Sequence, residues 1–193
     1  MMAGKFSALQ VAHDFIARHV KPGDFCIDAT AGRGHDTAFL CSLVGGSGHV
    51  LAFDIQQEAV DSTTELLHTR GFAGIGRAVL DSHANMAAYA APESVSCITF
   101  NFGWLPGGDH SINTRAESSI AAIEAGLRLL KPRGVMSLCI YYGRDTGFAE
   151  RDALMDYFKT IDHRAFTVIT AQFANRPNCP PIPVMITPFS RTA

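Results

Sequence analysis

The fold is decided by the stretch Phe25-Cys26-Ile27-Asp28-Ala29-Thr30-Ala31-Gly32-Arg33-Gly34-His35-Asp36-Thr37. A short apolar run ends at Asp28, passes through small residues and two glycines, and resumes at helical spacing from Ala38 to Val44. This pattern predicts a strand, a tight turn and the start of a helix. Glycine lets the backbone approach a bound molecule closely, and the N–H groups of a helix start face whatever lies there. The turn therefore indicates a ligand-binding loop.

Two ligand classes use this geometry, the dinucleotides and S-adenosylmethionine (SAM). The dinucleotide fingerprint requires a third glycine, and Thr37 occupies that place here. SAM has no pyrophosphate to bind, and an acid such as Asp28 at the strand end suits its amino group and sulfonium. The loop favours SAM, and the alternatives are a dinucleotide site and a tight turn without a ligand.

The composition fits one domain over residues 1–193 with an apolar content of 47% and a net charge of −2. This charge balance lacks the basic footprint of a tight, non-specific nucleic-acid binder, yet it leaves RNA binding open. The five cysteines form no closely spaced pair, so we expect core hydrophobes and neither disulfides nor metal ligands. Because no apolar run is long enough to span a bilayer and the first twenty residues do not resemble a signal peptide, we expect a cytoplasmic protein.

Acidic residues end three successive predicted strands. Asp28 ends the first strand, Asp54 lies near the end of the strand over residues 49–55, and Asp81 follows the strand over residues 74–80. In an open parallel sheet the ligand lies outside the carboxyl ends of the strands, so these acids indicate one pocket. Asp54 suits the hydroxyls of a ribose, and Asp81 suits the amine of adenine, with Ser82 or His83 flanking the ring. The alternative is that Asp54, Asp81 or Ser82 caps the helix that follows it.

The most unusual segment follows the fourth predicted strand, over residues 95–100, and is Asn101-Phe102-Gly103-Trp104-Leu105-Pro106-Gly107-Gly108-Asp109-His110. Asn101 and Trp104 stand in the order amide-x-x-aromatic, which resembles the loop of methyltransferases that act on exocyclic amines of nucleobases. In that chemistry the amide oxygen accepts a hydrogen bond from the target nitrogen, and the aromatic ring stacks on the base. The alternative is a Trp that buries the loop and an Asn that satisfies its backbone.

The rest of the chain completes an α/β pattern. We expect a leading amphipathic helix over residues 5–19 with His13 at its surface, helices over residues 114–130 and 150–161, and strands over residues 135–142, 166–173 and 184–186. Pro183 and Pro188 bracket the last strand, and we expect them to limit its pairing. Two final strands joined without a helix are typical of the Rossmann-like class I SAM-dependent methyltransferase fold. The prediction is a seven-stranded sheet whose last strand is antiparallel, with an extra N-terminal helix.

Several motifs together resemble one family. They are the loop from Asp28 to Thr37, Phe53-Asp54-Ile55-Gln56, Asp81-Ser82-His83, the segment from Asn101 to His110, and Ile140-Tyr141-Tyr142-Gly143. The sequence resembles the small bacterial methyltransferases described as rRNA methylases, which include the tRNA 5-aminomethyl-2-thiouridine methyltransferase of the YtqB/MnmM type. It departs from them at Tyr142-Gly143-Arg144, where relatives often carry histidines.

The resemblance implies methyl transfer from SAM to the aminomethyl group of 5-aminomethyl-2-thiouridine at the tRNA wobble position. It implies that Asn101 orients the amine and that Asp109 or His110 keeps the amine deprotonated. The substrate pocket would comprise Trp104, Gly107, Tyr142 and Arg144. The cofactor would contact Asp28, Thr30, Gly32, Gly34, His35, Asp36, Asp54, Gln56, Asp81, Ser82 and His83.

The expected partner is therefore tRNA, bound through its anticodon region, and we expect no metal and no membrane association. The expected assembly is a monomer or a homodimer. Within the methyltransferases, the alternative is an rRNA or small-molecule amine methyltransferase. Outside that class, the alternatives are a NAD-binding oxidoreductase and a non-catalytic RNA-binding protein.

Overall fold

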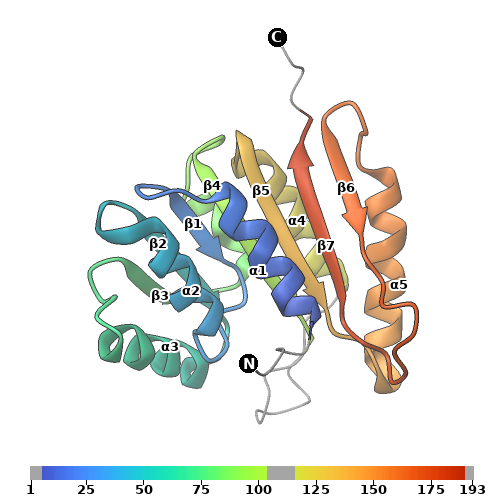
Figure 1. The fold of residues 1–193 in the computed structure, drawn as a ribbon, viewed down its shortest axis with the longest axis horizontal. Coiled ribbons are helices and arrows are strands. Elements are labelled where there is room, and N and C mark those ends of the chain that lie inside the picture. The colour runs from blue at the N-terminus through green and yellow to red at the C-terminus, as the bar shows by residue number, and fades with distance from the viewer. Residues whose placement is uncertain (1–5, 104–115, 190–193) are drawn as a thin grey trace.

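A seven-stranded sheet organises the computed structural model, which describes residues 6–103 and 116–189 (Figure 1). The strand order is β3-β2-β1-β4-β5-β7-β6. The strands are β1 (Phe25–Asp28), β2 (His49–Asp54), β3 (Gly76–Leu80), β4 (Val95–Phe102), β5 (Leu130–Ile140), β6 (Phe166–Thr170) and β7 (Ile182–Pro188). The pairs among β1 to β5 are parallel, and β7 pairs antiparallel with both β5 and β6. The sheet therefore has the predicted size and the predicted antiparallel last strand.

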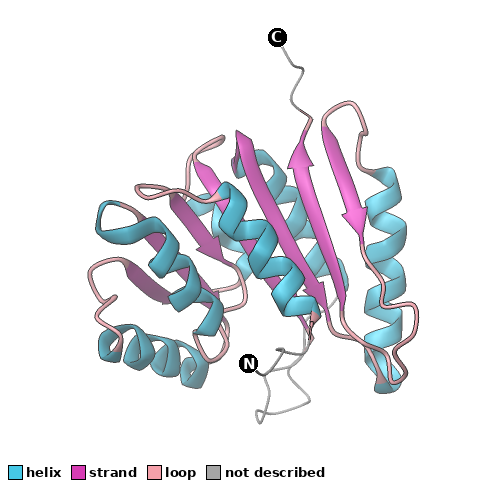
Figure 2. Cartoon of the chain, viewed as in Figure 1, coloured by secondary structure: helices cyan, strands magenta, loops and turns pink. Residues whose placement is uncertain are grey.

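Helices cover both faces of the sheet (Figure 2). They are α1 (Ala8–His19), α2 (His35–Val44), α3 (Gln57–Thr69), α4 (Ala116–Leu129) and α5 (Arg144–Thr160), with short 3-10 helices η1 (Gly45–Ser47) and η2 (His83–Ala88). In Figure 1, α1, α2 and α3 lie in front of the sheet, and α4 lies behind it and contacts η2 and α5. Helix α1 buries Ala8, Ala12 and Ile16, the face that its apolar stripe predicts, and packs across β5 and β7.

Apolar burial on both faces holds these layers together. Behind the sheet the core is built around Phe100, Ile123 and Met136. In front of the sheet a second cluster of buried side chains includes Leu40 and Val44. Cys26, Cys41, Cys97 and Cys139 are free and buried, as expected of small core hydrophobes. Burial raises the pKa of the Cys41 and Cys139 thiols to about 12, so both are inert at neutral pH.

Strand β7 and helix α5 are among the elements that are longer than the sequence predicts. Strand β7 has seven residues and contains both prolines, which we expected to limit its pairing. Pro183 still pairs with Cys139 and accepts a backbone hydrogen bond of 3.0 Å from Ala171 through its carbonyl, so the ladder continues past it. Helix α5 begins directly after Gly143, six residues before the predicted start. The prediction missed this start because the first turn lacks the apolar spacing that marks a helix in sequence.

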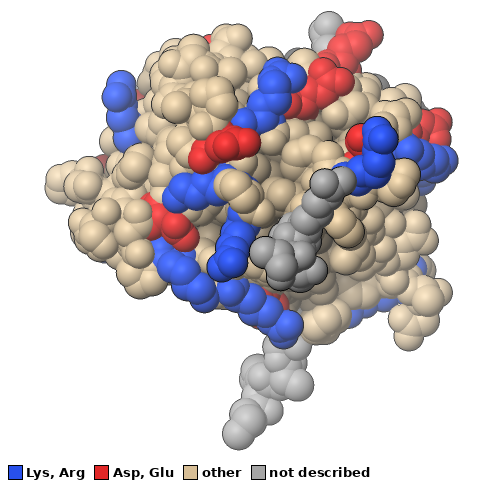
Figure 3. Space-filling view, turned by 90° about the horizontal axis from the view of Figure 1, so that it is seen from above, with Lys and Arg blue, Asp and Glu red and all other residues tan. Residues whose placement is uncertain are grey.

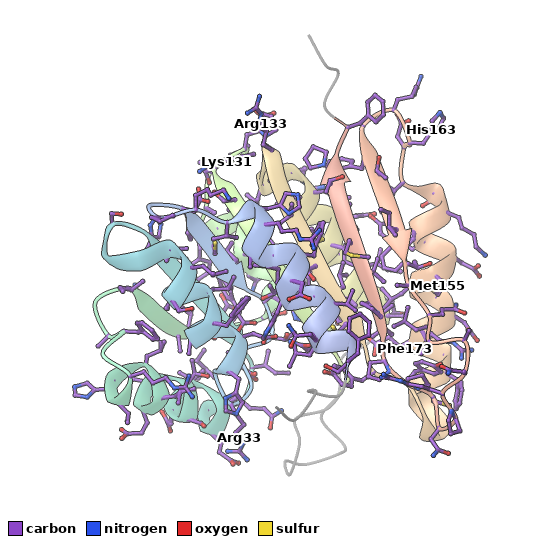
Figure 4. The ribbon with its side chains drawn as sticks, in the orientation of Figure 1. Arg33, Lys131, Arg133, Met155, His163 and Phe173 are labelled. Atoms are coloured by element: carbon purple, nitrogen blue, oxygen red, sulfur yellow. The ribbon has the colours of Figure 1, made fainter. Side chains whose placement is uncertain are left out.

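The two ends of the parallel strands differ in the side chains that lie there. Lys131 and Arg133 lie at the upper edge in Figure 4, where β5 begins, and Figure 3 shows Lys and Arg side chains gathered on that face. The carboxyl ends of the parallel strands β1, β2, β3 and β4 lie together at the opposite end. In the part of the chain that is described, no helix is both long and apolar enough to cross a bilayer.

Candidate functional site

A cavity of about 410 Å³ opens at the carboxyl ends of β1 to β4. The loops after these strands build most of its wall, and Leu9 of α1, Ser118 of α4 and Tyr141 close its sides. The sequence-predicted residues that line it are Thr30, Gly32, His35, Asp36, Asp54, Gln56, Asp81, Ser82, His83 and Asn101. The strand-end arrangement expected from the sequence therefore gathers these residues around one space.

Asp28 does not line this cavity, which differs from the expected direct contact with a ligand. The residue is fully buried beneath the loop, where its carboxyl group accepts hydrogen bonds from the Thr37 hydroxyl (2.6 Å) and the Thr30 N–H (3.2 Å). Burial, followed by the nearby Asp36 carboxylate, raises the pKa of Asp28 to about 7. Asp28 thus holds the loop together, and Asp36 supplies the carboxylate in the wall.

The two glycines of the loop have different tasks. Gly32 lines the cavity, whereas Gly34 lies outside its wall. Gly34 has a φ of 79°, and a Cβ there would lie 2.9 Å from the Cα of Thr63 on α3. Close packing of α2 against α3 therefore requires the glycine. Gly34 therefore has a packing role, and its contact with a ligand stays a prediction.

Asp54 ties the loop to the second strand. Its Oδ2 accepts a 2.9 Å hydrogen bond from the Gly32 N–H, and its Oδ1 accepts a 3.0 Å hydrogen bond from the Gln56 N–H. The Gly32 amide, which would face a pyrophosphate in a dinucleotide site, is already bound to a carboxylate. Each carboxylate oxygen of Asp54 keeps a lone pair that can accept a hydrogen bond from a ligand hydroxyl. Ile55 beside it is 59% exposed and offers an apolar surface to a flat ring.

The third strand end presents an ionised acid and a neutral imidazole. Asp81 accepts hydrogen bonds from the Asn85 side chain (2.7 Å) and the Tyr89 hydroxyl (2.8 Å), which lower its pKa. Burial lowers the pKa of His83, so its ring is uncharged at neutral pH. An ionised acceptor next to a neutral ring is suited to an amino-substituted heterocycle.

Asp36 joins two other polar side chains across the cavity wall. Its Oδ1 lies 2.8 Å from Nε2 of His13, and its Oδ2 accepts a 2.7 Å hydrogen bond from Nδ2 of Asn101. His13 also stacks on Phe39, with ring centroids 3.8 Å apart. The structure therefore corrects the expectation that His13 is a surface residue. Its spacing of four from Leu9, on one face of α1, was the available signal.

Hydrogen bonds hold both the backbone and the side chain of Asn101 in place. It lies within β4, which runs to Phe102 and so extends two residues beyond the expected end. Its N–H donates a 2.7 Å hydrogen bond to the Thr30 hydroxyl, and its side-chain nitrogen is bound by Asp36. These bonds fix which side of the amide carries oxygen. Among the described residues no donor binds the amide oxygen, which is thus left as an acceptor at this wall of the cavity.

The end of β5 supplies a tyrosine, one residue earlier than predicted. Tyr141 lines the cavity beside Gly103, whose φ of 144° favours glycine and lets the chain pass close to the Tyr141 ring. Burial raises the pKa of the Tyr141 hydroxyl to about 12, so it remains a hydrogen-bond donor. Tyr142, the predicted substrate contact, lies instead in the wall of a second cavity.

Several predicted residues lie outside what the structure describes. These are Trp104, Gly107, Asp109 and His110, together with the side chain of Arg144, whose backbone begins α5. In the described ranges, no group of three His, Cys, Asp or Glu side chains could hold a metal ion.

The charge of the cavity decides what class of ligand it suits. Asp36, Asp54 and Asp81 all face it, and Arg33 in its wall is paired with Glu58 at 2.9 Å. Three carboxylates around one space attract a cation and repel a pyrophosphate. The arrangement suits a nucleoside that carries positive charge and does not suit a dinucleotide.

Fold and site together define the class of the protein, a Rossmann-like class I SAM-dependent methyltransferase. A solved structure described as a "putative rRNA-methylase" from Clostridium thermocellum is 42% identical, with a TM-score of 0.93 over 95% of this chain and 98% of that one. A structure described as "a putative methyltransferase" from Streptococcus mutans, in complex with S-adenosylhomocysteine (SAH), is 32% identical, with a TM-score of 0.86 over 95% of this chain and 99% of that one.

The particular family follows from the sequence itself. The family described as "Putative rRNA methylase" matches residues 50–187, and the chain belongs to it. The chloroplastic tRNA (mnm(5)s(2)U34)-methyltransferase of Arabidopsis thaliana is 32% identical over 97% of this chain and 71% of that protein. These similarities confirm the resemblance that the motifs indicated.

Proposed function

We propose that this methyltransferase uses SAM to methylate the aminomethyl group of 5-aminomethyl-2-thiouridine at the wobble position of tRNA. The observation that carries the proposal is the hydrogen bond between Asp36 and Asn101. It commits the amide nitrogen to the protein and leaves the amide oxygen to accept a hydrogen bond from a substrate amine. Similarity to a plant tRNA (mnm(5)s(2)U34)-methyltransferase supports the choice of acceptor.

In this proposal the cofactor lies along the strand ends, in the order of the sheet. Asp54 and Gln56 bind the ribose, Ile55 packs on the adenine, and Asp81, Ser82 and His83 surround the edge of that ring. The methionine part contacts Thr30, Gly32, His35 and Asp36. The three carboxylates support this placement because SAM carries a positive sulfonium and an ammonium group. When bound, SAM supplies an electrophilic methyl group.

The protein's part in the reaction is alignment and control of one proton. Asn101 accepts an N–H of the amine and thereby turns the nitrogen lone pair toward the methyl group. The nucleophile must be the neutral amine, so the proton that it sheds passes to a base or to solvent. Asp109 or His110 would take that proton, and the ring of Trp104 and the backbone of Gly107 would hold the uridine. Arg144 remains a proposed substrate contact.

The proposal includes a single domain over residues 1–193 that works in the cytoplasm as a monomer or homodimer, without a metal. Its direct test is incubation of the purified protein with isotopically labelled SAM and bulk tRNA from a strain that lacks the terminal wobble methylation. We expect nucleoside mass spectrometry to find the label on 5-aminomethyl-2-thiouridine. Label on rRNA or on a small amine, with none on tRNA, would contradict the proposed acceptor and retain the chemistry.

A further inference from the structure

A second cavity, of about 440 Å³, lies between α5 and the connection from β6 to β7. No described residue lines both cavities. Its lining includes two arginines with aromatic and aliphatic neighbours, namely Tyr142, Arg151, Met155, Phe173, Arg176 and Ile182. Figure 4 shows Phe173 near the lower end of α1 and Met155 on the neighbouring α5.

Both guanidinium groups lie over aromatic rings. The Cζ of Arg151 lies 4.8 Å from the ring centre of Tyr142 and 4.9 Å from that of Phe148. The Cζ of Arg176 lies 4.0 Å from the ring centre of Phe173. Stacking holds a guanidinium plane in place and leaves its edge N–H groups to donate, which is the geometry that phosphate recognition uses. Aromatic side chains of this kind also stack on unpaired bases.

The two arginines differ in how far they are neutralised. Arg151 donates to its neighbour Asp152 through Nε at 2.8 Å and through Nη2 at 2.6 Å. Arg176 donates to the carbonyl of Phe6, and within the described residues it belongs to no ion pair. The cavity therefore keeps a positive charge on Arg176, and Asp152 reduces the charge at Arg151.

Short stretches of chain connect the lining of the second cavity to that of the first. Tyr141 lines the first cavity and Tyr142, the next residue, lines the second. On the other side, Leu9 lines the first cavity, while the ring of Phe6 contacts Phe173 of the second with centroids 6.2 Å apart. Segments of one to three residues thus connect the walls of the two cavities.

We propose that the second cavity binds the phosphate and base of a nucleotide next to the methylated one in a single-stranded RNA loop. This inference rests on the proposed function. Arg176 and Arg151 contact the phosphodiester, and Tyr142, Phe148 and Phe173 offer surfaces for the base. Such a contact fixes which nucleotide of the loop enters the catalytic cavity, and it requires no catalytic group of its own.

The test compares Arg176→Gln and Arg151→Gln with Arg164→Gln, which changes an exposed arginine paired with Asp162 and outside both cavities. An anticodon stem-loop RNA is the probe, and its Kd is measured by filter binding over a range of salt concentrations. We expect Arg176→Gln to raise the Kd for RNA about tenfold and to reduce the slope of log Kd against log salt by about 0.7. Arg164→Gln keeps both values, and every variant keeps its Kd for SAM.

Asp152→Asn gives a result of opposite sign, because it removes the negative charge beside Arg151 and tightens RNA binding. This variant and Arg176→Lys keep the test decisive if Arg176→Gln does not fold. Unchanged Kd and salt slope in the arginine variants, with unchanged affinity in Asp152→Asn, would overturn the inference.

Methyl transfer to the same RNA is measured in parallel to separate the two proposals. If the wild type transfers the methyl group and the variants keep the wild-type affinity for RNA, the second cavity is rejected as an RNA site. The proposed function is then retained. If the wild type neither binds nor methylates RNA, the proposed function fails, and the inference fails with it.

Discussion

Nδ2 of Asn101 lies 2.7 Å from Oδ2 of Asp36, and this hydrogen bond joins the fourth strand to the start of α2. Asp36 is in turn held from the other side by His13 of α1, at 2.8 Å. Three elements that are distant in the sequence therefore determine the orientation of one amide. A carboxylate that accepts from the amide nitrogen leaves the amide oxygen as an acceptor, and in our proposal this oxygen binds the substrate amine.

Asn101→Ala removes the proposed acceptor of the substrate amine and leaves the wall that surrounds the cofactor. We expect kcat to fall about 10²–10³-fold because the amine loses its orientation. The Kd for SAM, measured by calorimetry, stays close to the wild-type value. Asn101→Asp has a similar effect because it sets a second carboxylate against Asp36. Unchanged turnover in Asn101→Ala would remove this residue from the mechanism.

His13→Ala tests whether the imidazole acts through Asp36 as a positioning residue. We expect kcat to fall about tenfold with a small change in KM for SAM, because Asp36 loses one of its two restraints. His13→Gln keeps a hydrogen-bond donor and restores most of the rate. His19→Ala is the matched control on the same helix, since among the described residues that exposed ring bonds to and packs on Phe15 of α1 itself. Equal rates for the two alanine variants would contradict the prediction.

Asp28 gives the protein a stability that depends on pH. Its pKa is raised from 3.8 to about 7 by burial, so the folded state holds the proton more tightly than the unfolded state. The stabilising contribution of the protonated group is present below about pH 4 and is lost as pH rises to about 7. We expect Asp28→Asn to remove this loss.

The measurement is urea unfolding of both proteins between pH 4 and pH 8. The free energy of unfolding of the wild type should fall relative to that of Asp28→Asn by on the order of 2–4 kcal/mol across the window. Parallel curves over that range would show that the carboxyl group is ionised in the folded protein at no cost.

Gly34→Ala tests the packing role of the second loop glycine. The added methyl group must accept a φ of 79° and a contact of 2.9 Å with the Thr63 backbone. We expect the free energy of unfolding to fall by about 2–4 kcal/mol. Gly46→Ala, where a Cβ meets nothing within 4 Å, should change it by less than about 0.5 kcal/mol. Similar stability of the two variants would contradict the assignment.

The fold and the strand-end residues could be predicted because they depend on local pattern. Buried strands that end in acids, separated by helices, place those acids at one edge through parallel topology alone. Asp54 and Asp81 reach the cavity for this reason. The depth of Asp28 could not be predicted, because it depends on the Thr37 hydroxyl turning inward from the first turn of α2.

Contacts between side chains of different helices and strands could not be predicted from the sequence either. His13 meets Asp36 only because α1 packs over β4, β5 and β7, and the angle of that packing is a tertiary property. Tyr141 and Tyr142 are adjacent and chemically identical, so the sequence could not say which of them faces the first cavity. In the structure the Tyr141 N–H still donates to the Phe102 carbonyl at 2.9 Å, and the alternation of side chains along the strand turns Tyr142 to the other side.

The three carboxylates of the first cavity also bear on what happens after the chemistry. With the cofactor that we propose, the sulfonium becomes an uncharged thioether once its methyl group has left. Asp36, Asp54 and Asp81 then attract the spent molecule less than they attract the charged one that must replace it. In that proposal the acids that attract the donor also favour its entry in exchange for the product.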